Sequence, residues 1–369
     1  MEDLIFDKKI KNNKIAVAMS GGVDSSVAAV MLKKSGYDVI GITMKLYNNS
    51  DKVNSNKSCC AGIDINDAKK VAEEYNFPHH TIDLQNNFFN NVIDDFIETY
   101  SKGETPIPCI RCNQTVKFID MLNAAKEMNA DALVTGHYAR RIGSLNNAKL
   151  YRAKDKDKDQ TYFLFATTKD QLNYLRFPLG NYTKNEVREI AKKFNLKVQD
   201  KSDSQDICFV TNNSYNDLIT KLKPESLIKG NIVDVNKKII GSHSGIINYT
   251  VGQRRKIGIG GHVDPLYVIR INSERNEIVV GNKHDLKKNK VIVKNINWIS
   301  EVKNNSIKCS AKIKSDQKPQ RGEIKFSSTN TIEFEFEEPQ IYIAPGQACV
   351  FYKGDEVLGG GWINKEKIA

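Results

Sequence analysis

The sequence predicts a mixed α/β protein in which a doubly wound parallel sheet is followed by two small all-β domains. Between residues 14 and 209, short β-branched runs alternate with helical periods, which is typical of parallel α/β domains. After about residue 213 helical periods nearly vanish, and short strands are separated by Gly and Asn, as in small barrels. We expect domains at residues 1–212, 213–281 and 282–369; the second boundary is soft, because continuous β-rich sequence forms one barrel or two.

The elements of the first domain follow in chain order. The strand IAVAM, the helix SSVAAVMLKKSG and the strand YDVIGITM come first, then the helix DINDAKKVAEEYN and the strand HHTIDL. Helices are expected near residues 88–100 and 113–128, with the turn-rich GETPIPCIRC between them, and ALVTGHYA predicts a further strand. Later strands are expected within GNIVDVNKKIIGSHSG, LYVIRINSERNEIVVG, NKVIVKNINWIS, TIEFEFEEPQ and QACVFYKGDEVLGGGWI.

Charge and cysteine content narrow the class of protein. Lys and Arg number 55 against 44 Asp and Glu, a net charge of +11 that indicates a polyanionic partner without choosing between nucleic acid, nucleotide and anionic lipid. No apolar run approaches the roughly 20 residues that span a bilayer, and the start has no signal or transit pattern, so we expect a cytoplasmic protein without a membrane partner. Seven cysteines, an odd number, indicate thiols in a reducing compartment.

The segment from Ala18 to Ser26 is expected to bind phosphate. It follows the first strand and opens a helix, where glycines allow close backbone approach and N–H groups face an anion. Asp24 is then expected to be a ligand of Mg²⁺, which bridges carboxylate and phosphate oxygens. A tight βα turn with a Ser or Asp N-cap is the alternative. The expected ATP-binding residues here are Ala18, Met19, Ser20, Gly21, Gly22, Val23, Asp24 and Ser25.

The full SGGVDSS string has no counterpart of the lysine in GxxxxGK[ST] loops. It resembles the loop of the N-type ATP pyrophosphatases, which cleave ATP between the α- and β-phosphates and form an adenylate. The resemblance implies activation of a substrate by adenylation.

Three cysteines stand in a chemical context. Cys109 and Cys112 lie in TPIPCIRCNQTVKF, where Cys112 is expected to open a helix beside Arg111 and to have a depressed pKa. Cys208 lies in SDSQDICFV. Three interpretations of these cysteines are open. They are buried structural thiols, or ligands of an iron–sulfur cluster with one open site, or two of them act together as a reactive pair. The remaining Cys59, Cys60, Cys309 and Cys349 are interpreted as packing residues.

Several motifs together are similar to the tRNA-specific 2-thiouridylases. They are SGGVDSS, SCCAGIDINDAKKVAEEYN, GETPIPCIRCNQTVKF, LVTGHYAR, KDQTYFL, DSQDICFV and YTVGQRRKIGIG. The resemblance runs from about residue 14 to 280 and is weaker in the last barrel. It implies a first domain of the adenine-nucleotide α-hydrolase type, with ATP and Mg²⁺ as cofactors, tRNA as substrate and a sulfur-donor protein as partner. The implied reaction replaces the 2-oxygen of the wobble uridine by sulfur and releases AMP and pyrophosphate.

The resemblance also implies residue roles. Cys112 is the nucleophile, Cys208 carries a persulfide, and the two form a disulfide during turnover. Met44 and Gly136 contact the adenosine. The implied tRNA contacts are His137, Lys158, Asp159, Gln160 and Gln347, together with Lys314 and Ser315, which replace an Arg-Tyr pair of other members. Basic residues such as those at 254–256 and in the run 283–294 are expected to contact phosphates.

Two rival functions remain at this point. Another adenylating enzyme of the same superfamily, with a small-molecule substrate, has no need of Cys112 and Cys208. A non-catalytic tRNA-binding protein binds tRNA without releasing pyrophosphate.

Overall fold

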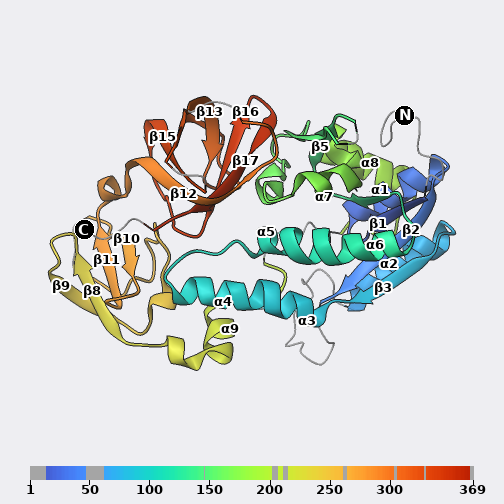
Figure 1. Cartoon of the computed structure of the whole chain (residues 1–369). Coiled ribbons are helices and arrows are strands. Elements are labelled where there is room, and N and C mark those ends of the chain that lie inside the picture. Colours follow the sequence, from blue (N-terminus) through green and yellow to red (C-terminus); the bar gives the residue numbers. More distant parts are fainter. Residues whose placement is uncertain are drawn as a thin grey trace.

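The computed structural model describes residues 14–46, 62–144, 146–201, 207–210, 215–260, 264–302, 306–327 and 330–365. Figure 1 shows the α/β part on the right, a barrel at the upper left and a smaller β domain at the lower left. The expected succession of one α/β domain and two β domains is thus confirmed. No helix in the described ranges is long and apolar enough to cross a bilayer.

The first sheet is parallel throughout and has the order β3-β2-β1-β4-β7. From β1 the chain passes first to β2 and β3 on one side and later to β4 and β7 on the other, so the strand order reverses between β1 and β4. Ligands bind at such a reversal, at the carboxyl ends of the strands. The bounds are β1 Lys14–Ala18, β2 Asp38–Lys45, β3 His79–Asp83, β4 Ala132–Thr135 and β7 Leu175–Arg176.

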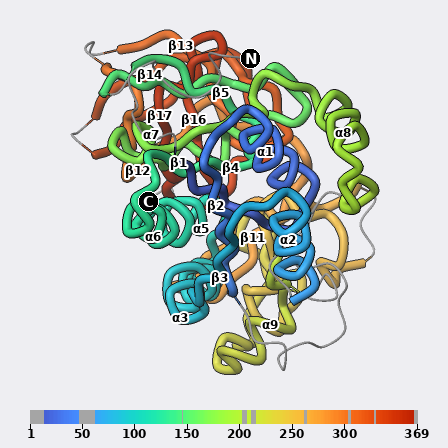
Figure 2. The backbone as a smooth tube through the Cα atoms, turned by 90° about the vertical axis from the view of Figure 1, so that its right-hand side faces the viewer, coloured from blue at the N-terminus to red at the C-terminus, as the bar shows by residue number. Residues whose placement is uncertain are grey.

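Helices cover both faces of this sheet, as Figure 2 shows, with α1, α2 and α8 on one side and α5 and α6 on the other. The alternation of β1 explains the two layers, because Ile15 and Val17 pack among α1, α2 and α8 while Ala16 faces the opposite core. The helices on the first face are α1 Val23–Lys34, α2 Gly62–Glu74 and α8 Lys184–Lys193.

Two long helical segments form the second face. The first consists of α3 Gln85–Phe88, a π-helical stretch Phe89–Ile93 and α4 Asp94–Ser101; the second consists of α5 Pro108–Cys112, a π-helical stretch Asn113–Met121 and α6 Leu122–Glu127. Both were expected, but the second begins at Pro108 rather than at Cys112. Proline is well suited to the first turn of a helix, where no N–H partner is required.

The expected strand ALVTGHYA is two strands. β4 ends at Thr135, and β5 (Ala139–Ile142) pairs with β6 (Lys149–Arg152) as a hairpin outside the parallel sheet. The break falls at Gly136, where a Cβ atom would lie 2.8 Å from the backbone nitrogen of Ser25. Turns Thr161–Leu164 and Pro178–Asn181 and the helix α7 Lys169–Tyr174 complete this part.

The middle domain is a four-stranded sheet with the order β10-β11-β8-β9. Its core contains Ile232, Val268, Ile278 and Val280, all fully buried. The elements are α9 Tyr215–Leu222, β8 Gly230–Asp234, β9 Ile239–His243, β10 Tyr267–Asn272 and β11 Glu277–Gly281, with short 3₁₀ turns at Pro224–Ser226, Ile246–Asn248 and Lys283–Leu286.

The last domain is a closed barrel. Six strands run in the order β12-β15-β14-β13-β16-β17, and the pairing of β12 with β17 closes the ring, which leaves no free edge within it. The β5–β6 hairpin extends the same sheet through the pairing of Tyr151 with Glu356. The strands are β12 Lys288–Trp298, β13 Ser306–Lys312, β14 Gln320–Phe326, β15 Thr331–Gln340, β16 Ala348–Lys353 and β17 Glu356–Ile363.

The segment from residue 102 to 107, between α4 and α5, meets both β domains. A Cβ atom on Gly103 would lie 2.5 Å from Ile271 of the middle domain, while the Thr105 N–H donates to the Pro345 carbonyl of the barrel at 2.7 Å. The helix carrying Cys109 and Cys112 is therefore held by all three parts of the chain. The boundaries proposed at 212 and 281 stay predictions, since sheets and contacts join the domains across them.

Candidate active site

The phosphate loop lies at the strand-order reversal. It runs from the end of β1 to the start of α1, and the Met19 N–H donates to the Ile42 carbonyl at 2.8 Å, so the loop continues the register of β1 with β2. Gly22 caps α1 and has no side chain to occupy its first N–H groups. These donors and the helix dipole favour an anion at this position.

Two glycines set the shape of the loop. Gly21 has φ +70°, and a Cβ atom there would lie 2.2 Å from the Asp64 carbonyl oxygen of α2. Gly136, at the end of β4, is pressed against Asp24 and Ser25. Inside the loop the Ser25 hydroxyl accepts from the Ser20 N–H at 3.1 Å, which leaves a narrow, rigid turn. Gly21 is thus required by close packing and by backbone conformation, and Gly136 by close packing.

Met44 is buried at the carboxyl end of β2, two residues beyond Ile42, which pairs with Ala18. Together with Gly136 it borders the same edge of the sheet as the phosphate loop. The structure therefore places the predicted adenosine-contacting residues beside the predicted phosphate-contacting residues, in an arrangement that suits a nucleotide.

Asp24 does not stand free for a metal ion. The Lys184 Nζ atom lies 2.8 Å from both carboxylate oxygens, and the Tyr138 hydroxyl donates to Oδ1 at 2.9 Å. No group of three or more His, Cys, Asp or Glu side chains in the described ranges is placed to hold a metal. The expected Mg²⁺ ligand is thus paired with a lysine, and the residues do not fit a resident Mg²⁺ site.

A second lysine holds the other side of the loop. Lys201 Nζ donates to the Gly21 carbonyl oxygen at 3.1 Å and to Asp67 at 2.9 Å, and it is also paired with Asp64. Two carboxylates and a carbonyl oxygen surround this ammonium, and these contacts raise its pKa against the opposing effect of burial. Lys201 therefore fixes α2 onto the phosphate loop.

Cys112 is a buried thiol with a raised pKa, contrary to the sequence prediction. It lies in the second turn of its helix, which starts at Pro108, and its side chain faces the apolar core. Burial raises the pKa of Cys112 to about 11, although the charge of Lys117 acts in the opposite direction. The adjacent Arg111 gives no help, because its guanidinium pairs with Asp95 at 3.2 Å.

Cys208 lies on the same apolar core as Cys112 and is half-buried. The ring of the next residue, Phe209, meets Phe96 edge-on with centroids 5.2 Å apart and Phe88 at 5.8 Å. These contacts fix the Cys208 segment on the first long helix. Residues 202–206 of its motif, and also Cys59 and Cys60, lie outside the described residues.

An iron–sulfur cluster does not fit the three cysteines. Such a cluster needs several thiolates around one centre. Cys109 is exposed, whereas Cys112 is buried, and the described residues bring together no triad of metal ligands. Cys309 and Cys349 lie in the barrel core, as expected of packing residues.

His137 follows Gly136 beside the phosphate loop. Its ring lies edge-on to Phe118 and Phe177, and its Nδ1 is 2.8 Å from the Thr135 hydroxyl. Burial, with a smaller effect of the nearby Lys117, lowers the pKa of His137 to about 3. His137 is therefore a neutral imidazole at physiological pH and does not pair with a phosphate as a cation.

The Lys158–Gln160 loop combines exposed and buried positions. Asp159 has a fully buried side chain that pairs with Arg152 at 3.2 Å and accepts from the Thr161 hydroxyl. A direct contact of this carboxylate with tRNA does not fit, because protein donors surround it. Gln160 exchanges hydrogen bonds with the Tyr138 backbone, both at 2.9 Å. Lys158 is half-buried.

Three predicted tRNA contacts come from the barrel, namely Gln347, Lys314 and Ser315. Gln347 donates from Nε2 to the Thr105 carbonyl oxygen at 3.2 Å, close to the thiol helix. Ser315 is exposed, and the Nζ atom of Lys314 lies 4.3 Å from the ring centroid of Tyr342. Tyr342 therefore places an aromatic ring beside Lys314, where the sequence alone shows only Lys-Ser.

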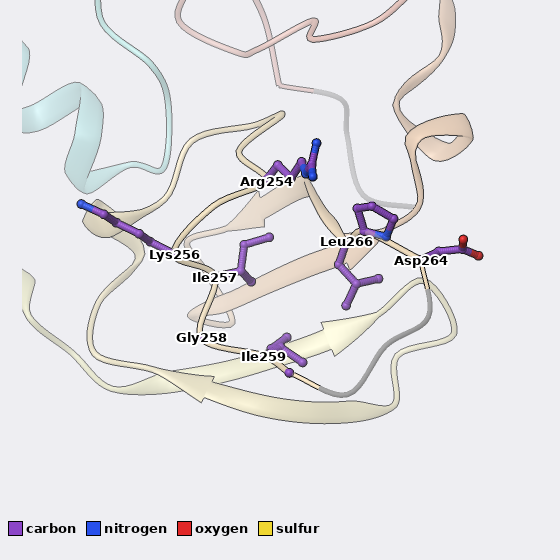
Figure 3. A pocket seen from close by; sticks show the side chains of 9 residues that line it. Arg254, Lys256, Ile257, Gly258, Ile259, Asp264 and Leu266 are labelled. Atoms are coloured by element: carbon purple, nitrogen blue, oxygen red, sulfur yellow. The ribbon is translucent and has the colours of Figure 1, made fainter.

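A basic pocket lies in the middle domain, away from the phosphate loop. Arg254, Lys256 and Asp264 border a hollow of about 380 Å³ with a floor of Ile257, Ile259 and Leu266. Figure 3 shows the apolar side chains around the hollow and Lys256 extending away from it. The mixture of cations and apolar groups is compatible with the expected phosphate contacts at 254–256.

Sequence reasoning missed Lys184, Tyr138 and Lys201. The string TKNE was the available signal, because Thr183 and Glu186 form a capping box that makes Lys184 the first residue of α8. The box predicts a helix start but not the partner that the lysine meets 160 residues away.

All three parts of the chain match family models. Residues 13–212 match the tRNA methyl transferase HUP domain, residues 216–282 the tRNA methyl transferase PRC-barrel domain, and residues 288–363 the aminomethyltransferase beta-barrel domain. Among solved structures, a 4-thiouridine synthetase–RNA complex with bound ATP is similar at 19% identity over 57% of this chain and 50% of that chain, with a TM-score of 0.31.

Curated relatives are far closer in sequence. The tRNA-specific 2-thiouridylase MnmA of Orientia tsutsugamushi (strain Boryong) is 51% identical over 96% of each chain. Its namesake from Wolbachia sp. subsp. Drosophila simulans (strain wRi) is 50% identical over 98% of each. That of Ehrlichia ruminantium (strain Welgevonden) is 48% identical over 98% of this chain and all of the relative. With this identity over nearly the whole length, the chain belongs to the tRNA-specific 2-thiouridylase family.

Proposed function

We propose that this chain is a tRNA-uridine 2-sulfurtransferase that replaces the 2-oxygen of the wobble uridine by sulfur and consumes ATP. Close relatives over the full length carry the name 2-thiouridylase. The observation that carries the proposal is that one α/β domain holds a phosphate loop at its strand-order reversal and two thiols, Cys112 and Cys208, on one apolar core.

In the first step the uridine is activated. ATP lies along the carboxyl edge of the sheet, with its phosphates at residues 18–25 and its adenosine at Met44 and Gly136. The uridine O2 attacks the α-phosphorus, the bond from this phosphorus to the bridging oxygen breaks, and pyrophosphate leaves while the N3 proton is lost. The N–H groups at the start of α1 stabilise the negative charge on the phosphates. Mg²⁺ accompanies the nucleotide and has no ligand in Asp24.

In the second step sulfur replaces the adenylate. A donor protein first loads Cys208 with a persulfide. The terminal sulfur bonds to C2, AMP leaves, and Cys112 Sγ attacks Cys208 Sγ, which releases the 2-thiouridine and leaves a Cys112–Cys208 disulfide. A dithiol reductant returns both thiols by two-electron reduction. The alternative order, in which Cys112 first releases sulfide that then attacks C2, balances in the same way.

The tRNA lies across the junction of the three domains. Lys158, Gln160, Gln347, Lys314 and Ser315 are proposed contacts, and His137 contacts the tRNA as a neutral ring. Specificity comes from a flipped-out anticodon base, which costs less in a loop than in a duplex. The proposal includes a sulfur-donor protein as partner, because Cys208 must receive its persulfide sulfur. It also includes a cytoplasmic location, because the substrate is tRNA.

The test is mass spectrometry of nucleosides after tRNA is incubated anaerobically with the protein, ATP, Mg²⁺ and a persulfide donor, with AMP and pyrophosphate followed in parallel. We expect one AMP to be released for each 2-thiouridine formed. The variants Cys112→Ser and Cys208→Ser should form no 2-thiouridine. Cys309→Ser is the matched control, because this thiol lies in the barrel.

The outcomes separate the proposal from its rivals. Pyrophosphate release on a small amide or carboxylate without tRNA, and unaffected by both cysteine changes, favours the small-molecule adenylating enzyme. Binding of tRNA with neither AMP nor 2-thiouridine favours a non-catalytic protein. Either result overturns the proposed function.

A further inference from the structure

The position of Lys184 is set by several independent contacts. It is the first residue of α8, where Thr183 and Glu186 form a capping box, and its own N–H donates to Asp155 at 2.9 Å. Its side chain is only 9% exposed and ends on both oxygens of Asp24 at 2.8 Å. The ammonium is thus held at the first turn of α1, beside the phosphate loop.

The loop needs a cation that its own sequence does not contain. A phosphate site of this kind holds several negative charges, and SGGVDSS has no lysine or arginine. Lys201 is less suited to the task, because it is shared between Asp64, Asp67 and the Gly21 carbonyl. Lys184 instead contacts Asp24 in the first turn of α1, directly beside the loop.

Asp24 is equipped to hold this lysine. A buried ammonium is costly unless it is paired and hydrogen-bonded. The Asp24 carboxylate supplies the pair, and the Tyr138 hydroxyl, donating at 2.9 Å, fixes the orientation of the carboxylate. Gln160 in turn holds the Tyr138 backbone. This chain of contacts occupies the carboxylate that the sequence assigns to Mg²⁺.

We propose that Lys184 is a catalytic residue that contacts the β- and γ-phosphates of ATP and that Asp24 is its positioning residue rather than a metal ligand. This inference rests on the proposed adenylation. As the bond from the α-phosphorus to the bridging oxygen breaks, negative charge grows on the departing pyrophosphate. The three N–H donors of the ammonium allow it to contact Asp24 and a phosphate oxygen at once.

The test measures single-turnover pyrophosphate release from ATP in the presence of tRNA, together with the Kd for ATP. Lys184→Met keeps the apolar stem and removes the charge, and we expect release to slow about 100-fold, the usual effect of losing one such donor. The Kd for ATP should rise less than about tenfold, since the contact strengthens as pyrophosphate leaves. Lys184→Arg should recover most of the rate, because it restores the cation.

The control is Lys192→Met, an exposed lysine of the same helix whose ammonium pairs with Glu189 at 3.0 Å. It should keep the wild-type rate. Thermal unfolding and tRNA affinity of Lys184→Met verify that the variant is folded. If folded Lys184→Met releases pyrophosphate within threefold of wild type, the inference is wrong. If wild-type protein releases none, it is the proposed function that fails.

Mg²⁺ dependence decides the role of Asp24. We expect Asp24→Asn to slow pyrophosphate release as Lys184→Met does, and to leave the Mg²⁺ concentration for half-maximal rate unchanged. The double variant should be no slower than the slower single variant, because both changes disrupt the same Lys184–Asp24 pair. A rise of more than tenfold in the Mg²⁺ requirement of Asp24→Asn alone would make Asp24 a metal ligand and overturn the inference.

Discussion

Gln347 donates a hydrogen bond to the carbonyl oxygen of Thr105 at 3.2 Å, although 242 residues separate the two in sequence. Beside it the Thr105 N–H donates to the Pro345 carbonyl oxygen at 2.7 Å. A loop of the barrel therefore binds both the N–H and the carbonyl group of Thr105. Thr105 lies three residues before Pro108, where the helix carrying Cys109 and Cys112 begins. This contact links the barrel to the position of Cys112.

The first prediction tests this link at Gly346. It has φ +85°, and a Cβ atom would lie 2.9 Å from the Thr105 nitrogen. Gly346→Ala should push the two loops apart, reduce 2-thiouridine formation about tenfold or more, and cost about 1–3 kcal/mol of unfolding free energy. Gly354→Ala is the matched control, since Gly354 also has positive φ, +60°, but no atom within 4 Å of its Cβ position. Equal activity losses in the two variants would refute the link.

The second prediction concerns the reactivity of Cys112. Because burial raises its pKa to about 11, its thiolate is scarce at pH 8, and its alkylation by iodoacetamide should accelerate about tenfold per pH unit until about pH 11. The exposed Cys109 should react faster at pH 8. Trypsin cleaves after Arg111, so mass spectrometry reads the two thiols on separate peptides. Faster alkylation of Cys112 than of Cys109 at pH 8 would contradict the raised pKa.

The raised pKa of Cys112 also makes the unfolding free energy depend on pH. A folded-state pKa above the unfolded value means that the thiol of Cys112 stabilises the fold fully below the unfolded pKa, and that this contribution is lost as pH rises from there to about 11. In Cys112→Ser the group no longer titrates. The wild type should therefore lose more unfolding free energy than the variant between pH 8.5 and 10.5, as measured by urea titration at each pH.

The fourth prediction separates folding from recognition at Asp159. Asp159→Asn removes the partner of a buried cation, Arg152, whose side chain is 16% exposed, and should cost about 3–5 kcal/mol of unfolding free energy. Chemical denaturation measures this loss. At a temperature where the variant is folded, its tRNA affinity should change little. A large loss of affinity with unchanged stability would instead restore Asp159 as a direct contact.

The fifth prediction concerns Lys158. If it contacts a tRNA phosphate, Lys158→Ala should weaken binding and lower the slope of log affinity against log salt by about one unit. Filter binding between 50 and 200 mM salt measures the slope. Lys193→Ala, an exposed lysine of α8, should leave it unchanged. An unaltered slope in Lys158→Ala would place this lysine on a solvated face only.

Local pattern was sufficient to predict the order of α/β and β domains and the helices up to residue 127, but not α7, α8 and α9. It failed where long-range packing decides. The strand ALVTGHYA breaks because Gly136 meets α1, and Cys112 loses its expected low pKa because its helix starts earlier and turns it into the core. The pairing of Asp24 with Lys184 lies equally beyond local pattern, since the two residues approach only when α8 packs against α1.

The β5–β6 hairpin has a consequence for how the chain is made. It belongs to the α/β part of the sequence, yet its sheet continues into β17, which the ribosome adds about 200 residues later. Until then the edge of the hairpin has no strand beside it, and the segment before the thiol helix lacks its barrel contact. Sequence-distant pairing of this kind forms slowly and leaves strands open to aggregation. The segment before the thiol helix therefore gains its contacts with Pro345 and Gln347 only near the end of synthesis.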